Sequence, residues 1–81
     1  MWKGYDIPLV KGEWTKIECE DEILIAGVAE YKVQIKPSEN SEGGYITMDN
    51  TTWLKIDQDV WARPINLQKV TTPIVKVWRK S

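Results

Sequence analysis

The sequence contains no histidine, no phenylalanine and a single cysteine, Cys19, among its 81 residues. Without histidine, the usual general base and the nucleophilic triads that depend on it are absent. One cysteine cannot form an intramolecular disulfide, and no Cys/His metal framework can be written. These absences predict no catalytic residue, no metal ligand and no cofactor, so we expect a protein that acts by binding or assembly and not as an enzyme.

Carboxylate pairs could still supply acid–base chemistry. Asp57 and Asp59 are the most closely spaced pair in a turn, but this spacing is typical of a solvated β-turn. Too few oxygen ligands lie nearby in the sequence for a calcium site. Gly43-Gly44 lacks the following Lys-Ser/Thr and the helix of a phosphate-binding loop. Cys19 lies on the apolar side of its predicted strand, which favours a small core residue.

Long apolar runs are also absent. No stretch approaches the ~20 residues of a membrane span, so we expect a soluble chain without a membrane partner. The first residues have no signal-peptide hydrophobic region, and a lone cysteine fits a reducing cytoplasm. The formal net charge of −1 argues against nonspecific nucleic-acid binding. The sequence also shows no basic strand face with interleaved aromatic residues, as single-stranded nucleic-acid binders have.

The charges are unevenly distributed along the chain. Residues 1–42 hold five lysines and nine acidic residues, whereas residues 43–81 hold six basic and three acidic residues. Two interpretations stay open. The charges either lie on solvated faces or bring subunits together head to tail, acidic side to basic side.

What is abundant is alternation of apolar and polar residues, as in Tyr31, Val33 and Ile35. β-Branched residues and tryptophan dominate these runs, and no window shows a helical apolar stripe. The pattern predicts an all-β fold, a small antiparallel β-sandwich or flattened barrel of about seven short strands. The predicted strands cover residues 15–20, 23–26, 31–36, 45–48, 51–56, 59–63 and 74–79, with a weaker one at 68–71.

Hairpin turns are expected at residues 20–22, 49–50 and 57–58.

Successive side chains of a strand point to opposite faces, so the parity of a residue in its strand predicts whether its side chain is buried. Lys32, Gln34 and Lys36 should lie in water. The predicted core consists of Ile17, Cys19, Ile23, Ile25, Val33, Ile35, Ile46, Leu54, Ile56, Val60, Ala62, Val75 and Val77.

The first thirteen residues differ from the rest. They include two glycines and a proline with poor periodicity, so we divide the chain into an extended N-terminal arm (1–13) and a β-sandwich domain (14–81). Trp2, Tyr5, Ile7 and Leu9 make this arm too apolar for a free tail. We expect it to pack across a neighbouring subunit, and the alternative is an edge strand on its own sandwich.

Two tryptophans are expected to face away from the core. Trp53 and Trp61 have the opposite parity to the apolar residues beside them in their predicted strands. Their outward face could be covered by the protein's own loops, by a partner, or by a sugar stacked on the rings.

Six short segments follow one another in a recognisable pattern. They are Trp14-Thr15-Lys16-Ile17, Ile23-Leu24-Ile25, Tyr31-Lys32-Val33-Gln34-Ile35, the acidic loop from Glu39 to Gly44, Val60-Trp61-Ala62-Arg63 and Ile74-Val75-Lys76-Val77. In this pattern the chain resembles small β-sandwich structural proteins of tailed bacteriophages. The resemblance spans residues 14–78 and implies modules that decorate or complete a virion, without catalytic residues. If Arg63 matches the recurrent arginine of these proteins, it either pairs with an acid such as Asp59 or faces a partner.

We therefore expect a non-enzymatic assembly module, a bacteriophage virion component of the capsid-decoration or tail-associated type. It would form homo-oligomers, contact other virion proteins and be made in the bacterial cytoplasm. The alternative is a carbohydrate-binding module that uses exposed tryptophans. The candidate interface residues are Trp2, Tyr5, Ile7, Leu9, Trp53, Trp61 and Arg63.

Overall fold

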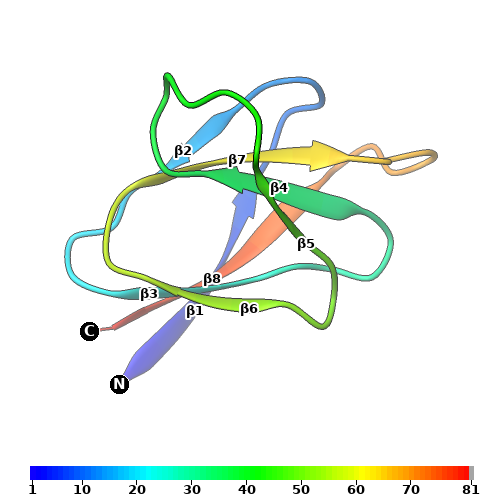
Figure 1. The fold of residues 1–81 in the computed structure, drawn as a ribbon. Helices are drawn as coiled ribbons and strands as arrows, with labels where there is room; N and C mark the ends of the chain where they lie inside the picture. Colours follow the sequence, from blue (N-terminus) through cyan, green and yellow to red (C-terminus); the bar gives the residue numbers. More distant parts are fainter. Residues whose placement is uncertain (81) are drawn as a thin grey trace.

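The structure is a computed structural model that describes residues 1–80, and it contains β-strands and no helix within that range. Two four-stranded antiparallel sheets pack face to face (Figure 1). The strands are β1 (Trp2–Pro8), β2 (Thr15–Ile17), β3 (Ile23–Ala26), β4 (Lys32–Lys36), β5 (Ile46–Met48), β6 (Trp53–Ile56), β7 (Val60–Ile65) and β8 (Ile74–Lys80). The predicted all-β sandwich is confirmed, and the sheets are not closed into a barrel.

The order of the strands defines the topology. Sheet A has the order β1-β8-β3-β6, and sheet B has the order β2-β7-β4-β5. This is the strand order of an eight-stranded jelly roll, in which the chain passes back and forth between two sheets. The fold is found in viral capsid and lectin domains alike, so it does not by itself decide the function.

Among the strands of residues 1–80, only β4 and β5 are consecutive strands of the same sheet. The turns at residues 20–22, 49–50 and 57–58 therefore connect the two sheets, and their prediction as hairpins is wrong. The weak strand predicted at residues 68–71 is also wrong, because this segment forms turns before β8. Hairpin signals in the sequence identify where the chain reverses, but they do not show which sheet it enters next.

The N-terminal segment is an edge strand of sheet A. β1 pairs with β8 along its whole length, from Trp2 opposite Lys80 to Pro8 opposite Ile74. Leu9 follows β1, is buried in the core, and donates its backbone N–H to the Pro73 carbonyl at 2.9 Å. Within this chain, residues 2–9 thus adopt the second of the two arrangements considered for the arm, as part of the sandwich itself.

The core lies between the sheets and contains most of the predicted residues, while Cys19, Leu54 and Ile56 are partly buried against it. Ile46, for which parity predicts burial, is 50% exposed. It lies on the edge strand β5 and lines a surface hollow together with Pro37 and Gly44. Core residues not predicted from the sequence are Leu9, Tyr31, Met48 and Leu67.

Tyr31 connects the two sheets just before β4. Its hydroxyl donates to the Ile74 carbonyl at 2.8 Å and also accepts the Ile74 N–H. The ring is buried, so the hydroxyl has its partners inside the protein and not in water. Tyr31 therefore fixes the start of β8 against the connection between β3 and β4.

Replacing Tyr31 with phenylalanine should lower the free energy of unfolding by about 1–3 kcal/mol, because both polar groups of Ile74 lose their partner. Burial raises the pKa of Tyr31, so the folded state favours the neutral phenol. Wild-type stability should fall as the pH rises above about 10, where the unfolded phenol ionises, and Tyr31→Phe should lose this part of the fall. Thermal unfolding followed by circular dichroism at neutral and alkaline pH measures both effects, with Tyr5→Phe at an exposed position as the control. Equal stability of Tyr31→Phe and wild type at both pH values would contradict the assignment.

Candidate functional site

Two tryptophans stack on the outer face of sheet A, the side turned away from sheet B. The ring centroids of Trp53 and Trp78 are 5.0 Å apart and their planes differ by 25°. Trp53 is 58% exposed, and register places Trp2 on the same side of the sheet, beyond Gly4. We call Trp2, Trp53 and Trp78 the tryptophan face.

Small residues allow the rings to lie close to the sheet. A Cβ atom on Gly4, which pairs with Trp78, would lie 3.1 Å from the indole Nε1. Ala26 pairs with Trp53 and is buried, although it does not belong to the core cluster between the sheets. The tryptophan face therefore covers sheet A where its strands carry small side chains.

Ion pairs surround the tryptophan face. Lys76 in β8 lies 3.9 Å from the Asp6 carboxylate in β1. Glu22, just before β3, pairs with Lys55 at 3.2 Å and with Lys80 at 3.8 Å. An apolar centre with a charged rim is the usual anatomy of a protein–protein interface.

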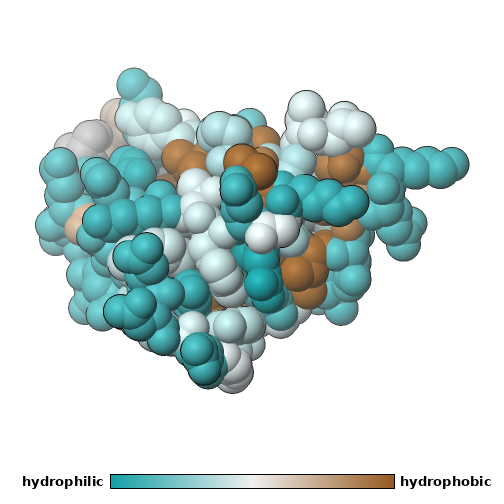
Figure 2. Space-filling model, turned by 90° about the horizontal axis from the view of Figure 1, so that it is seen from above, coloured by the Kyte–Doolittle hydropathy of each residue, from teal (hydrophilic) through white to brown (hydrophobic). Residues whose placement is uncertain are grey.

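The outer face of sheet B has a different character, because cations and aromatic rings alternate on it. The Arg63 guanidinium carbon lies 4.4 Å from the Trp14 ring centroid and 5.6 Å from that of Tyr45. The Lys36 ammonium also lies 4.4 Å from the Trp14 ring centroid, and the Lys16 ammonium lies 5.7 Å from that of Trp61. Figure 2, which views this side of the molecule, shows a mostly hydrophilic surface with small separate hydrophobic areas.

This face corrects two expectations from the sequence. A basic strand face with interleaved aromatic residues is present, although none was evident from the sequence. Lys36 is 5% exposed and not in water, because Trp14 and the chain after β4 cover it. Its ammonium donates to the Glu39 carbonyl at 2.8 Å, which holds the 37–45 loop against the sheet.

Arg63 does not pair with Asp59. The Asp59 carboxylate instead accepts the Cys19 N–H at 2.8 Å and lies 3.5 Å from the Lys16 ammonium. Arg63 donates to the Gln34 side-chain oxygen at 2.6 Å, and its buried Nε has no hydrogen-bond partner within residues 1–80. Within residues 1–80 Arg63 forms no ion pair. Its guanidinium group therefore interacts with the rings of Trp14 and Tyr45 and with the Gln34 amide, and not with a carboxylate.

The acidic residues gather at one end of the sandwich. The antiparallel register brings three loops together there, residues 18–22, 37–45 and 57–59 (Figure 1). We call these loops the acidic end, because they contain no lysine or arginine and hold eight of the twelve acidic residues. Those eight are Glu18, Glu20, Asp21, Glu22, Glu39, Glu42, Asp57 and Asp59.

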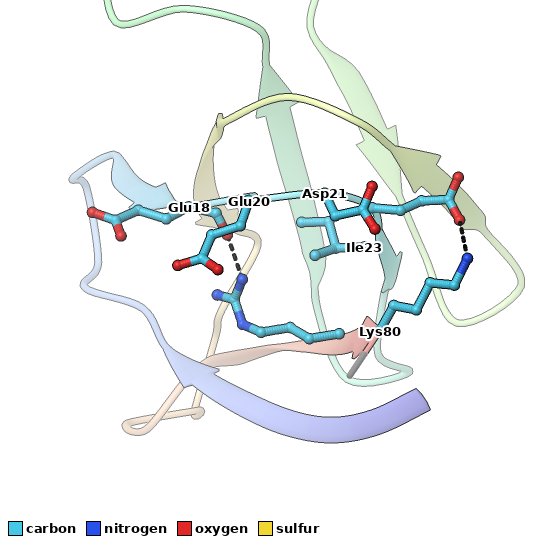
Figure 3. A pocket seen from close by; sticks show the side chains of 7 residues that line it. Glu18, Glu20, Asp21, Ile23 and Lys80 are labelled. Carbon is cyan, nitrogen blue, oxygen red and sulfur yellow. Dashed lines mark hydrogen bonds and ion pairs between the residues drawn. The ribbon is translucent and has the colours of Figure 1, made fainter. Parts of the chain in front are cut away.

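A hollow of about 270 Å³ opens at this end between residues 18–23 and the end of β8. Arg79 donates to the Glu18 carbonyl there, and Figure 3 shows Lys80 on one side of the hollow with Glu18 and Glu20 on the other. The carboxylates of Glu18, Glu20 and Asp21 form no ion pair among residues 1–80. This end therefore presents free negative charge.

The pKa values of two groups near this end, Asp59 and Cys19, are shifted in directions that suit structural roles. The hydrogen bond from the Cys19 N–H, together with Lys16, lowers the pKa of Asp59. Burial and the neighbouring Asp59 raise the pKa of the Cys19 thiol, whose Sγ lies 3.6 Å from the Ile56 carbonyl. A protonated, partly buried thiol is a poor nucleophile. No group of three or more His, Cys, Asp or Glu side chains within residues 1–80 is placed to hold a metal ion.

The candidate interface residues fall into three places. Trp2 and Trp53 share the outer face of sheet A, and Trp61 and Arg63 lie on the outer face of sheet B. Ile7 and Leu9 pack against or within the core, and Tyr5 is on their side of β1 but remains exposed at the sheet edge. The sequence analysis missed Trp78, Trp14 and Tyr45 as site residues. The parity of Trp78 in its strand was a usable signal, as was that of Tyr45, which lies beside the predicted core residue Ile46 in the strand predicted for residues 45–48. Trp14 precedes its predicted strand and carried no such signal.

Residues 1–80 include no helix long and apolar enough to cross a membrane. Comparison of the chain with models of protein families, with curated proteins and with solved structures found no match.

Proposed function

We propose that this chain is a non-enzymatic assembly module that acts through protein–protein contacts, with the tryptophan face as its main contact surface. The observation that carries the proposal is the exposed stack of Trp53 on Trp78, which is framed by ion pairs. Tryptophan is among the residues most often found at the energetic centre of interfaces. The resemblance of residues 14–78 to phage structural proteins supports a place in a virion, beside copies of itself and other virion proteins.

A carbohydrate-binding module is the second candidate, because exposed tryptophan rings can also stack on sugars. Trp53 and Trp78 stack on each other, so each ring has one face already occupied. A sugar would have only the remaining outward surface of the pair. This geometry favours a broad protein contact over a sugar site.

Mutation of Trp53 to alanine tests the proposal. The wild type should show a mass that increases with concentration in light scattering, and Trp53→Ala should weaken the association by at least about tenfold. Trp53 is mostly exposed, so the far-ultraviolet circular dichroism spectrum should not change. Ile46→Ala, at another half-exposed apolar position on the other sheet, is the matched control and should associate as the wild type does.

A wild type that stays monomeric at all concentrations would contradict self-assembly. If it also bound glycans with quenching of tryptophan fluorescence, and Trp53→Ala abolished that binding, the carbohydrate-binding function would replace the proposal.

A further inference from the structure

A second surface, at the end of the sandwich opposite the acidic end, has the chemistry of an anion-binding site. A shallow hollow of about 470 Å³ lies where β7 ends, and residues 11–12 and 63–68 line it. Two cations, Lys11 and Arg63, contribute to this lining, and no acidic residue of the described chain does. We call it the basic hollow.

Neither cation of the basic hollow is neutralised. Lys11 is exposed, and within residues 1–80 neither Lys11 nor Arg63 forms an ion pair. Trp14, Tyr45 and Gln34 hold the Arg63 guanidinium in place, so little side-chain freedom remains to be lost on binding. Arg63 and Lys11 therefore supply to one hollow two cations without an acidic partner, and such cations are suited to bind carboxylates.

The backbone of the basic hollow is strained. Asn66 and Gln68 have φ angles of 57° and 50°, in the left-handed region. Asparagine adopts this conformation readily, but glutamine does so at a cost, and such strain is concentrated at functional sites. The two residues are exposed and place amide groups on the rim of the hollow.

The position of the basic hollow relative to the acidic end suggests its occupant. β7 begins at Val60, next to Asp59, and ends at Ile65, so residues 65–68 of the hollow lie at the other end of this strand from the acidic loops 18–22 and 57–59 (Figure 1). The Arg63 guanidinium lies nearer the middle of the sheet, against Trp14 and Tyr45. Glu18, Glu20 and Asp21 supply carboxylates without an ion pair in the loop of residues 18–22, and the basic hollow supplies cations without an ion pair, all within residues 1–80. Complementary charges at opposite ends join copies head to tail, in a ring or a filament.

The aromatic rings near Arg63 do not favour a nucleic acid as the occupant. Bases bind single-strand proteins by stacking on free aromatic faces. Here cations already lie over the rings, with Arg63 and Lys36 on Trp14 and Lys16 on Trp61. An acidic peptide segment can bind to the cations through its carboxylates and does not need a free aromatic face.

We propose that the basic hollow binds the acidic loop 18–22 of a second copy of this chain, so that copies associate head to tail. This inference names the partner within the assembly of the proposed function and rests on that function.

A peptide with the sequence of residues 16–23, with serine in place of Cys19, tests the contact directly. Isothermal titration calorimetry should show the full-length protein binding this peptide, and binding should weaken as salt is added. Lys11→Gln and Arg63→Gln should each weaken binding by about tenfold. Lys32→Gln, at an exposed lysine of sheet B outside the hollow, should bind as the wild type does. A peptide in which glutamine and asparagine replace the acids should not bind.

Lys11→Gln keeps the test decisive if Arg63→Gln disturbs the packing of Trp14, because Lys11 is exposed. No binding to the wild type, or equal binding to Lys11→Gln and the wild type, would overturn the inference. Tighter binding of a single-stranded oligonucleotide than of the peptide would also overturn it, in favour of a nucleic acid.

Light scattering separates this inference from the proposed function. If Glu18→Gln/Glu20→Gln/Asp21→Asn weakens association and Glu39→Gln/Glu42→Gln does not, the acidic loop is the contact. If the wild type associates, Trp53→Ala abolishes association and neither acidic variant changes it, the head-to-tail contact is wrong and the assembly function stands. If the wild type stays monomeric and yet binds the peptide at Lys11 and Arg63, the hollow binds acidic segments and the assembly function is wrong.

Discussion

Replacing Gly27 with alanine should destabilise the protein more than any other single methyl addition at a glycine of the chain. A Cβ atom at Gly27 would collide with the Asp49 carbonyl oxygen and would lie 2.7 Å from its carbonyl carbon. These are backbone atoms, so relief requires the end of β3 to move away from the connection between β5 and β6. We expect a loss of at least about 3 kcal/mol, out of the ~5–15 kcal/mol that usually separates folded and unfolded states.

The turn at Asp49 has little freedom to give way. The Asp49 carboxylate accepts the Thr51 N–H at 2.8 Å and the Thr51 and Thr52 hydroxyls at 2.6 and 3.1 Å. These hydrogen bonds lower the pKa of Asp49, so the carboxylate stays ionised and the turn stays closed at neutral pH. The Gly27 N–H also points to this turn, at 3.4 Å from the Thr52 carbonyl.

Chemical denaturation measures the effect, with Gly12→Ala as the control. Gly12 has a φ of 78°, but nothing lies within 4 Å of the position that a Cβ atom would take. Alanine there therefore costs only backbone strain of about 1–2 kcal/mol. If Gly27→Ala were no more destabilising than Gly12→Ala, the close approach of β3 to the Asp49 turn would be wrong.

Deleting residues 1–10 should have the second large effect, because it removes a complete strand. β1 supplies seven register pairs with β8, and Leu9 supplies a buried side chain. Loss of Leu9 alone should cost about 2–5 kcal/mol by the usual range for large buried aliphatic residues. The truncated protein should unfold at a much lower temperature, and its newly exposed β8 edge should promote aggregation.

This deletion also decides between the two arrangements of the arm. An arm that packs only on its own sandwich predicts a loss of thermal stability in the truncated protein, with the oligomeric mass unchanged where it still folds. A folded monomer with an unchanged β spectrum would show instead that residues 1–10 connect subunits. Lys3→Ala, at an exposed position of β1, is the control for changes that leave the strand in place.

Local patterns were sufficient to predict most of the strands. The alternation of apolar and polar residues predicts β4 and β8 close to their observed bounds, and the continuous apolar run from Ile23 to Ala26 predicts β3. Parity also predicts the correct face for Lys36, but not its burial. Trp14, which covers it, lies more than twenty residues away in the sequence, and only the pairing of β2, β7 and β4 brings them together.

The candidate surfaces depend even more on distant pairings. The division of charge between the two halves of the sequence is not the division seen in space, because Asp57 and Asp59 from the basic half join the acidic end. Arg63 meets Gln34 through the register of β7 with β4. Lys11 and Arg63 line the same hollow because β7 ends beside the chain that leads into β2. No periodicity within one segment could have predicted these neighbours.

The alternation of the chain between two sheets has a kinetic consequence. β8 lies between β1 and β3, so the middle of sheet A is formed by the last strand, residues 74–80, and its partner β1 is the first. Bringing β1 and β8 together closes a long loop, which costs conformational entropy before the contacts between the two strands can stabilise the sheet. Folds dominated by such distant pairings fold slowly. A nascent chain could not assemble sheet A until β8 had left the ribosome, and until then its exposed strand edges would be open to other chains.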